Sequence, residues 1–323
     1  MLTDKSVRFQ QNIPIALLKM TNVKSHLLVL LATIIVAGSF LASENLAGII
    51  SPFSLTLLRF AGAFVLLIPV IIYKKRWRDK VMTTLPRAIV ISFFYAAFFI
   101  GWFESLNTTT ALNTGTLFTL VPLITALLAA ILLREKMNRR QLFVYLIGAS
   151  GAIWIIFGGQ LEQFLLFSLS KGDLIFLLAA VSMCCYSVSM KLLYRDDEMI
   201  VLVFCTLLGG SFWMVLALLL TGQPLEWHLI QSDSALNMAY LIIGATLITV
   251  YLYQKTTVAL GPARVNAYIY LNPAFVAILL FLIDGVSIPM EILPGFIISL
   301  MATMMLQKNN DQESTAIPVK KTR

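Results

Sequence analysis

Long apolar segments recur along the whole chain, and they constrain its fold more than any other feature. Reading the apolar runs between charged and turn residues gives ten segments: 25–43, 53–73, 87–103, 109–133, 141–157, 173–193, 199–220, 236–253, 263–283 and 292–306. A helix needs roughly 20 apolar residues to cross the hydrocarbon core of a bilayer. The sequence therefore predicts an all-α integral membrane protein with ten transmembrane helices and a lipid bilayer around it.

The composition excludes several other classes of protein. Of the 323 residues, 59% are apolar and only 12% are charged, against ~45–50% and ~25% in an average soluble domain. These values exclude a soluble enzyme, a disordered protein and a nucleic-acid-binding protein, although the net charge is +8. The three cysteines all lie in apolar segments, and His26 and His228 lie far apart, so we expect no disulfide, no metal site and no cofactor.

The distribution of basic residues predicts the orientation in the membrane. With the N-terminus in the cytoplasm, every Lys and Arg except Arg59 and Lys171 lies in a tail or in a loop on the cytoplasmic side. Because cytoplasmic loops carry an excess of Lys and Arg, we expect both tails, residues 1–24 and 307–323, to be cytoplasmic. An odd number of membrane-spanning segments would place basic residues on both sides of the membrane, so this distribution also supports ten segments.

The two halves of the chain resemble each other. The segment around Pro122 has a counterpart around Pro273. We therefore predict two repeats of five helices, at 25–158 and 173–306, joined by an extracytoplasmic linker at 159–172. Because five is odd, the second repeat must be inverted relative to the first. Inverted repeats are typical of secondary transporters, which bind their substrate near the midplane between the halves.

A series of short motifs runs through both repeats. The motifs are Gly38-Ser39-Phe40, Pro52 with Arg59, Ala111…Gly115…Pro122…Glu135, Gly172-Asp173 and Gly261-Pro262-Ala263-Arg264…Pro273. In this order they resemble the drug/metabolite transporter superfamily, in its EamA-type branch of ten-helix transporters. The resemblance implies that the first four helices of each repeat surround a central cavity. It also implies export of a small organic metabolite, an amino acid or a related compound, across the inner membrane by alternating access.

Other functions remain as alternatives. Uptake or exchange of a charged metabolite, such as S-adenosylmethionine or a nucleotide derivative, requires basic groups in the cavity, for which Arg59, Lys255 and Arg264 are the candidates. A channel does not need the repeat. An integral-membrane enzyme needs clustered nucleophiles or metal ligands, which the sequence does not show. We therefore predict a transporter and not an enzyme.

Polar and aromatic residues recur at helical spacing within the apolar segments. Such side chains are costly in hydrocarbon unless they are paired, so they are expected to face the interior. The residues predicted to line the substrate cavity are Ser39, Tyr95, Trp102, Asn113, Thr116, Tyr186, Asn266 and Tyr270. Hydrogen bonding between packed helices is the alternative explanation for these polar residues.

Two prolines lie in the middle of predicted helices. Pro122 and Pro273 each remove one helical hydrogen bond and free the carbonyl groups of Phe118 and Ile269. These helix breaks are expected either to help bind the substrate and allow bending, or to form packing kinks.

Arg59 is the charge that most needs a partner. It lies about two turns inside the second segment, where an unpaired charge costs several kcal/mol. The sequence predicts an ion pair with Glu104, with Glu44 as the second choice, acting either as a structural contact or as an outer gate. Glu104 is also the best candidate for binding a coupling proton, although a carrier without a coupling ion fits equally well. The small residues at 148–151 permit a homodimer contact.

Overall fold

The computed structural model describes residues 15–46, 49–166 and 169–314, and no β-strand occurs in them. Ten helices and helical stretches correspond to the ten predicted segments. The elements are α1 (Ile15–Glu44), α2 (Pro52–Tyr73), α3 (Lys75–Ser105), α4 (Ala111–Phe118), α5 (Val121–Leu132), α6 (Arg139–Ile156), α7 (Leu161–Leu165), α8 (Lys171–Leu193), α9 (Met199–Thr221), η2 (Trp227–Leu229), α10 (Ser232–Ala239), η3 (Tyr240–Ile248), α11 (Thr249–Leu260), α12 (Pro262–Ala267), η4 (Tyr268–Leu271), α13 (Asn272–Asp284), η5 (Met290–Ile292) and α14 (Leu293–Ser314).

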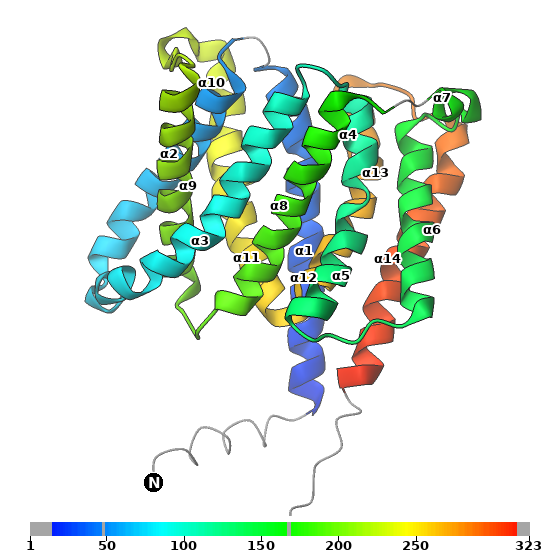
Figure 1. Ribbon diagram of the computed structural model, residues 1–323, viewed down its shortest axis with the longest axis horizontal. Coiled ribbons are helices and arrows are strands. Elements are labelled where there is room, and N and C mark those ends of the chain that lie inside the picture. Colours follow the sequence, from blue (N-terminus) through cyan, green and yellow to red (C-terminus); the bar gives the residue numbers. More distant parts are fainter. Residues whose placement is uncertain (1–14, 47–48, 167–168, 315–323) are drawn as a thin grey trace, which may run out of the picture.

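Nine stretches within the described residues are long and apolar enough to cross a membrane. The remaining predicted segment is α6, which has 18 residues. Its first three residues, Arg139, Arg140 and Gln141, are polar and lower its mean hydropathy. In Figure 1, α6 still lies lengthwise beside α14. The protein is an all-α membrane protein, and each predicted segment has a helical counterpart among the described residues.

Short-range sequence signals explain where several helices begin. The Ser51 hydroxyl accepts a hydrogen bond from Ser54 N at the start of α2, and Pro52 takes the first helical position. Asn138 and Gln141 form a capping box at the start of α6. Ser170 and Asp173 form a second capping box at the start of α8. Each cap satisfies backbone N–H groups that have no partner inside the helix.

The connections alternate between two ends of the bundle. The α2–α3, α5–α6, α8–α9 and α11–α12 connections lie at the end where α1 begins and α14 ends, which we call the terminal face (Figure 1). The α3–α4, α9–α10 and α13–α14 connections lie at the other end, which we call the distal face. The helices thus cross the bundle in alternating directions.

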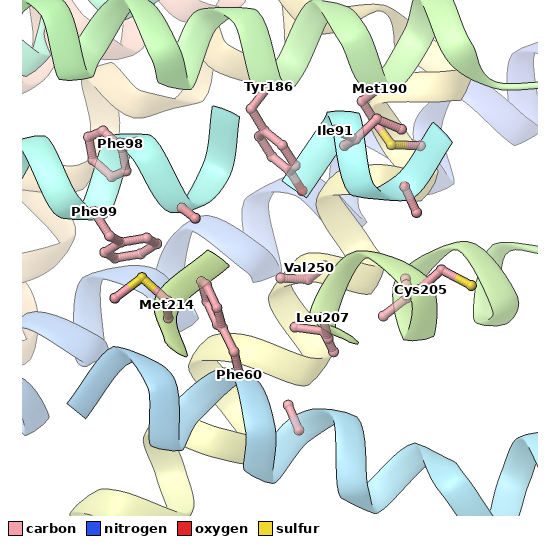
Figure 2. Close-up of a cluster of buried hydrophobic side chains, with 14 of the residues drawn as sticks. Phe60, Ile91, Phe98, Phe99, Tyr186, Met190, Cys205, Leu207, Met214 and Val250 are labelled. Carbon is pink, nitrogen blue, oxygen red and sulfur yellow. The ribbon is translucent and has the colours of Figure 1, made fainter. Parts of the chain in front are cut away.

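The two halves of the chain interlock instead of packing as separate bundles. In Figure 1, α3 of the first half lies against α8 and α9 of the second half, and α1 lies against α11. The largest buried apolar cluster joins α2, α3, α8, α9 and α11 (Figure 2). The interior of the molecule is therefore built from both halves.

Small residues are used for packing inside the chain. A Cβ atom on Gly148 would lie 2.5 Å from Tyr270 Cε2, and one on Gly151 would lie 2.7 Å from Ser299 Oγ. The face of α6 that carries these glycines is therefore covered by α14 and η4 of the same chain. The predicted use of residues 148–151 in a homodimer contact is not supported by this packing.

Candidate functional site

Arg59 reaches from α2 into the second half of the chain. Its Nε donates a hydrogen bond to Thr246 Oγ1 at 3.1 Å, and its Nη2 lies 3.5 Å from the carbonyl oxygen of Ala245. Both partners belong to η3, a nine-residue π-helical segment, and such segments are frequent at functional sites. The guanidinium carbon also lies 5.9 Å from the centre of the Phe99 ring, within the range of a cation–π contact.

The predicted Arg59–Glu104 ion pair is not formed in this structure. Glu104 is exposed at the end of α3, where it accepts a 3.4 Å hydrogen bond from Asn107 Nδ2. The difference arises because α2 packs directly against η3, so that the nearest polar groups lie across the boundary between the halves. The side chain of Glu44, the second predicted partner, lies outside the described residues.

Aromatic rings next to Arg59 form a stack across the same boundary. The Tyr95 ring lies 5.3 Å from that of Phe60 and 4.6 Å from that of Tyr186, both nearly parallel to it, and 5.2 Å edge-on from that of Phe99. Figure 2 shows Phe60, Phe99 and Tyr186 converging from different helices. Tyr95 of the first half and Tyr186 of the second half, both predicted to line the cavity, are thus brought together.

Gln254 completes this group of side chains. It is buried on α11, and its Nε2 donates to Thr206 Oγ1 at 3.0 Å and lies 3.5 Å from Tyr186 Oη. Its Oε1 is buried and has no hydrogen-bond partner among the described residues. Burying an unsatisfied acceptor costs about 1–3 kcal/mol. We call Arg59, Tyr95, Tyr186 and Gln254 the central site.

Gln254 directly follows the eighth predicted segment, which ends at residue 253, so it is not among the residues predicted from the sequence. The structure continues α11 to Leu260. The sequence signal for Gln254 is a single amide side chain that directly follows Tyr253 in a stretch that also contains Thr246. In the structure, Tyr253 is part of the interior as well, since its Oη lies 3.4 Å from Thr33 Oγ1 of α1. Because hydropathy alone defines the end of the predicted segment, a polar residue of the interior falls outside it.

Two of the predicted cavity residues form links between helices. Asn266 Nδ2 donates to Thr125 Oγ1 at 2.8 Å and to Ser187 Oγ at 3.1 Å, which ties α12 to α5 and α8. Tyr270 is fully buried, and its hydroxyl donates to the carbonyl of Tyr145 on α6 at 2.8 Å. These contacts favour helix packing over cavity lining for both residues.

The other four predicted cavity residues contact groups outside the central site, although the Trp102 ring centre also lies 6.2 Å from that of Phe99, which contacts Arg59. Asn113 Nδ2 donates to Asp173 at 3.1 Å, joining α4 to the capping box of α8 near the distal face. Trp102 stacks on Phe98 and Phe103, with ring centres 5.8 and 5.7 Å away. Ser39 donates to the carbonyl of Val36 in its own helix, and Thr116 is buried in α4.

Both predicted helix breaks occur. The first lies between α4, which ends at Phe118, and α5, in which Pro122 is one of the first two residues. The second is the short η4 segment before α13, with Pro273 again one of the first two residues of the helix. Of the two carbonyl groups expected to be freed, that of Ile269 accepts a hydrogen bond from Asn272 N.

The two breaks share one cavity. It has a volume of about 510 Å³, and its mainly apolar walls include Gly115, Phe118, Ile269 and Pro273. Asn272 contributes a buried Oδ1 that has no partner among the described residues. The two helix breaks, far apart in the sequence, are thus brought to the wall of the same cavity.

A group of charges lies near the terminal face. Glu135, which follows α5, approaches Gly261 so closely that a Cβ atom there would lie 3.2 Å from Glu135 Oε1. Burial raises the pKa of Glu135, while the nearby charges of Lys191 and Arg264 act in the opposite direction. Lys191 Nζ donates to the carbonyl of Val258. The approach of Glu135 to Gly261 connects the two halves near the terminal face.

Comparison with known proteins agrees with this architecture. Residues 23–157 and residues 170–307 each match the EamA-like transporter family. The chain belongs to this family. A transporter of the EamA-like family crosses the bilayer and moves a small molecule, so the chain is a membrane transporter.

The relatives of this EamA-like transporter are similar over most of their length. The chain is 22% identical to the uncharacterized transporter YyaM of Bacillus subtilis, over 92% of this chain and 100% of that protein. It is 25% identical to an uncharacterized transporter of Archaeoglobus fulgidus, over 80% of this chain and 89% of that protein. A solved crystal structure has a TM-score of 0.72 and 18% identity, over 91% of this chain and 99% of that one, and it supports the fold alone.

Proposed function

We propose that this transporter exports a small organic metabolite, an amino acid or a related compound, across the inner membrane by alternating access. The observation that carries the proposal is the central site at the boundary between the halves, where Arg59 lies beside the aromatic stack of Tyr95 and Tyr186, and Gln254 lies beside Tyr186 with an unpartnered side-chain oxygen. A guanidinium group suits a carboxylate, and an amide oxygen suits an ammonium or another N–H donor.

The position of the central site fits alternating access. Its side chains come from α2 and α3 of the first half and from α8 and α11 of the second. A substrate bound there contacts both halves, so movement of one half against the other changes its surroundings. The Lys and Arg residues favour a cytoplasmic terminal face, so export runs towards the distal face.

Counterflow in proteoliposomes tests this proposal. Labelled amino acids, nucleotide derivatives, S-adenosylmethionine and cationic drugs are offered one at a time to the purified protein. We expect saturable, counterflow-stimulated flux for an amino acid or a related compound. Flux that rises linearly without saturation supports a channel, and counterflow only of nucleotide derivatives or S-adenosylmethionine supports the alternative substrate class.

Substitution of Arg59 tests the assignment of the central site. Arg59→Met keeps the length of the side chain but removes its charge, and we expect it to abolish counterflow. Arg139→Gln is the control, because Arg139 begins α6 at the terminal face, away from the site. Equal loss in both variants, or full activity of Arg59→Met, would contradict the assignment.

A further inference from the structure

A second pocket lies at the terminal face, outside the central site. Its volume is about 490 Å³, and α3 and the α8–α9 connection form its walls. Lys80, Arg87 and Arg195 contribute three cations to the lining, and Asp196 and Asp197 contribute two carboxylates. The cations offer several donors for an anion.

Part of this charge is already neutralised inside the protein. Arg87 Nη2 lies 2.7 Å from Asp197 Oδ1, which also accepts from Thr84 at 3.2 Å, and the backbone N–H of Arg195 donates to Asp197 Oδ2 at 3.2 Å. Both carboxylate oxygens of Asp197 are thus occupied. The remaining donors are the Arg195 side chain, Lys80 and Arg87 Nη1, which has no partner among the described residues.

More positive charge surrounds the pocket. Lys74, Lys75, Arg76 and Arg78 lie at the start of α3, and Glu198 contacts Arg76 and lies 3.8 Å from Lys80. The basic residues outnumber the acidic ones in this region. A basic pocket between membrane helices is suited to the headgroup of an anionic lipid.

An apolar stripe runs from this pocket along the outside of α3. Met82, Pro86, Val90 and Phe93 follow one another at spacings of four, four and three residues, which places them on one face of the helix. All four are exposed, and Pro86 is part of the pocket wall. In Figure 1 the N-terminal part of α3 lies on the outside of the bundle, where a bilayer would surround it.

We propose that this pocket binds the phosphate headgroup of an anionic phospholipid, with the acyl chains lying along the stripe on α3. The adjoining cations bind the phosphate oxygens, and the apolar stripe selects an amphiphile over a free phosphate. The bound lipid joins α3 of the first half to the α8–α9 connection of the second half.

Thermal unfolding of the purified protein in detergent, with and without added lipid, tests this inference. We expect phosphatidylglycerol to raise Tm by roughly 2–4 °C more than phosphatidylcholine does. Glycerol phosphate provides the soluble headgroup without acyl chains and is expected to have no effect. An equal shift by both lipids, or by glycerol phosphate alone, would overturn the proposal.

Paired variants connect the effect to the pocket. Lys80→Gln combined with Arg195→Gln should remove most of the response to phosphatidylglycerol, whereas Lys80→Arg combined with Arg195→Lys should keep it. Both side chains are exposed, so their replacement should leave the fold intact. Arg139→Gln combined with Arg140→Gln removes two charges from the start of α6 at the same face and is the control. A loss in this control as large as in the pocket variant would also overturn the proposal.

Discussion

Gln254 has a buried side-chain oxygen without a hydrogen-bond partner among the described residues, which is costly in stability. Replacement by leucine removes this unsatisfied oxygen together with the hydrogen bond to Thr206. We expect Gln254→Leu to abolish counterflow while changing the free energy of unfolding by less than about 1 kcal/mol, because the two losses offset each other. Counterflow and Tm are measured on the same preparation. Thr206→Val, which removes only the hydrogen-bond partner, should retain transport; a fully active Gln254→Leu variant would contradict the role of the amide.

Glu135 should make the stability of this conformation depend on pH. Burial raises the pKa of its carboxyl group above the value in the unfolded chain. The neutral carboxyl is therefore favoured in the folded protein, so its stabilising contribution is present at low pH and is lost as the pH rises through the folded pKa.

The variant Glu135→Gln should remove this dependence. We expect the Tm of the unmodified protein, measured relative to that of the variant, to rise by roughly 1–3 °C as the pH is lowered from about 7 to about 4. Glu104→Gln, at an exposed carboxylate on the distal face, is the control. Parallel pH profiles of the unmodified protein and Glu135→Gln would show that this group does not contribute.

At the level of helices, the close contact between α6 and α14 depends on glycine at positions 151 and 295, where a side chain would collide with the other helix. A Cβ atom on Gly151 would lie 2.9 Å from the backbone oxygen of Gly295, which cannot rotate away. We expect Gly151→Ala to lower the free energy of unfolding by about 1–3 kcal/mol. Gly115→Ala is the matched control, because nothing lies within 4 Å of its Cβ position; this change should be neutral or stabilise α4 by up to about 1 kcal/mol. Thermal unfolding separates the two, and equal Tm values would contradict this account.

The breaks at Pro122 and Pro273 should affect movement more than stability. Alanine restores the backbone N–H and permits a continuous helix. We expect Pro122→Ala and Pro273→Ala to slow counterflow several-fold while leaving membrane abundance unchanged. A fall in abundance that matches the fall in flux would show that the prolines serve packing instead.

For the whole molecule, the alternation of helices makes a strict prediction of sidedness. The connections that contain Gln223 and Gly285 both follow helices that end at the distal face (Figure 1). Reporter fusions after these residues should be extracytoplasmic, and a fusion after Lys136, in the α5–α6 connection, should be cytoplasmic. A cytoplasmic result at Gln223 or Gly285 would contradict the proposed orientation and the inverted repeat.

The sequence by itself determined where the chain forms helices. Apolar length set the spans, and Pro122 and Pro273 marked the breaks; the caps at Ser51 and Ser170, which the structure shows, are equally local. All of these depend on interactions within one or two helical turns, so they can be read along the chain. The inward preference of polar groups in hydrocarbon selected Tyr95 and Tyr186, whose role in binding stays a prediction, together with residues such as Asn266 and Tyr270 that link helices.

Only the tertiary structure decided which interior groups meet. Arg59 contacts Thr246 instead of Glu104, Gln254 joins the central site, and Tyr270 turns towards α6. Such contacts depend on how each helix is rotated and at which height it crosses its neighbours. In a membrane helix, the side that faces lipid and the side that packs against protein are both apolar, because hydrocarbon and protein interior accept the same side chains. The sequence of such a helix therefore does not indicate how the helix is rotated.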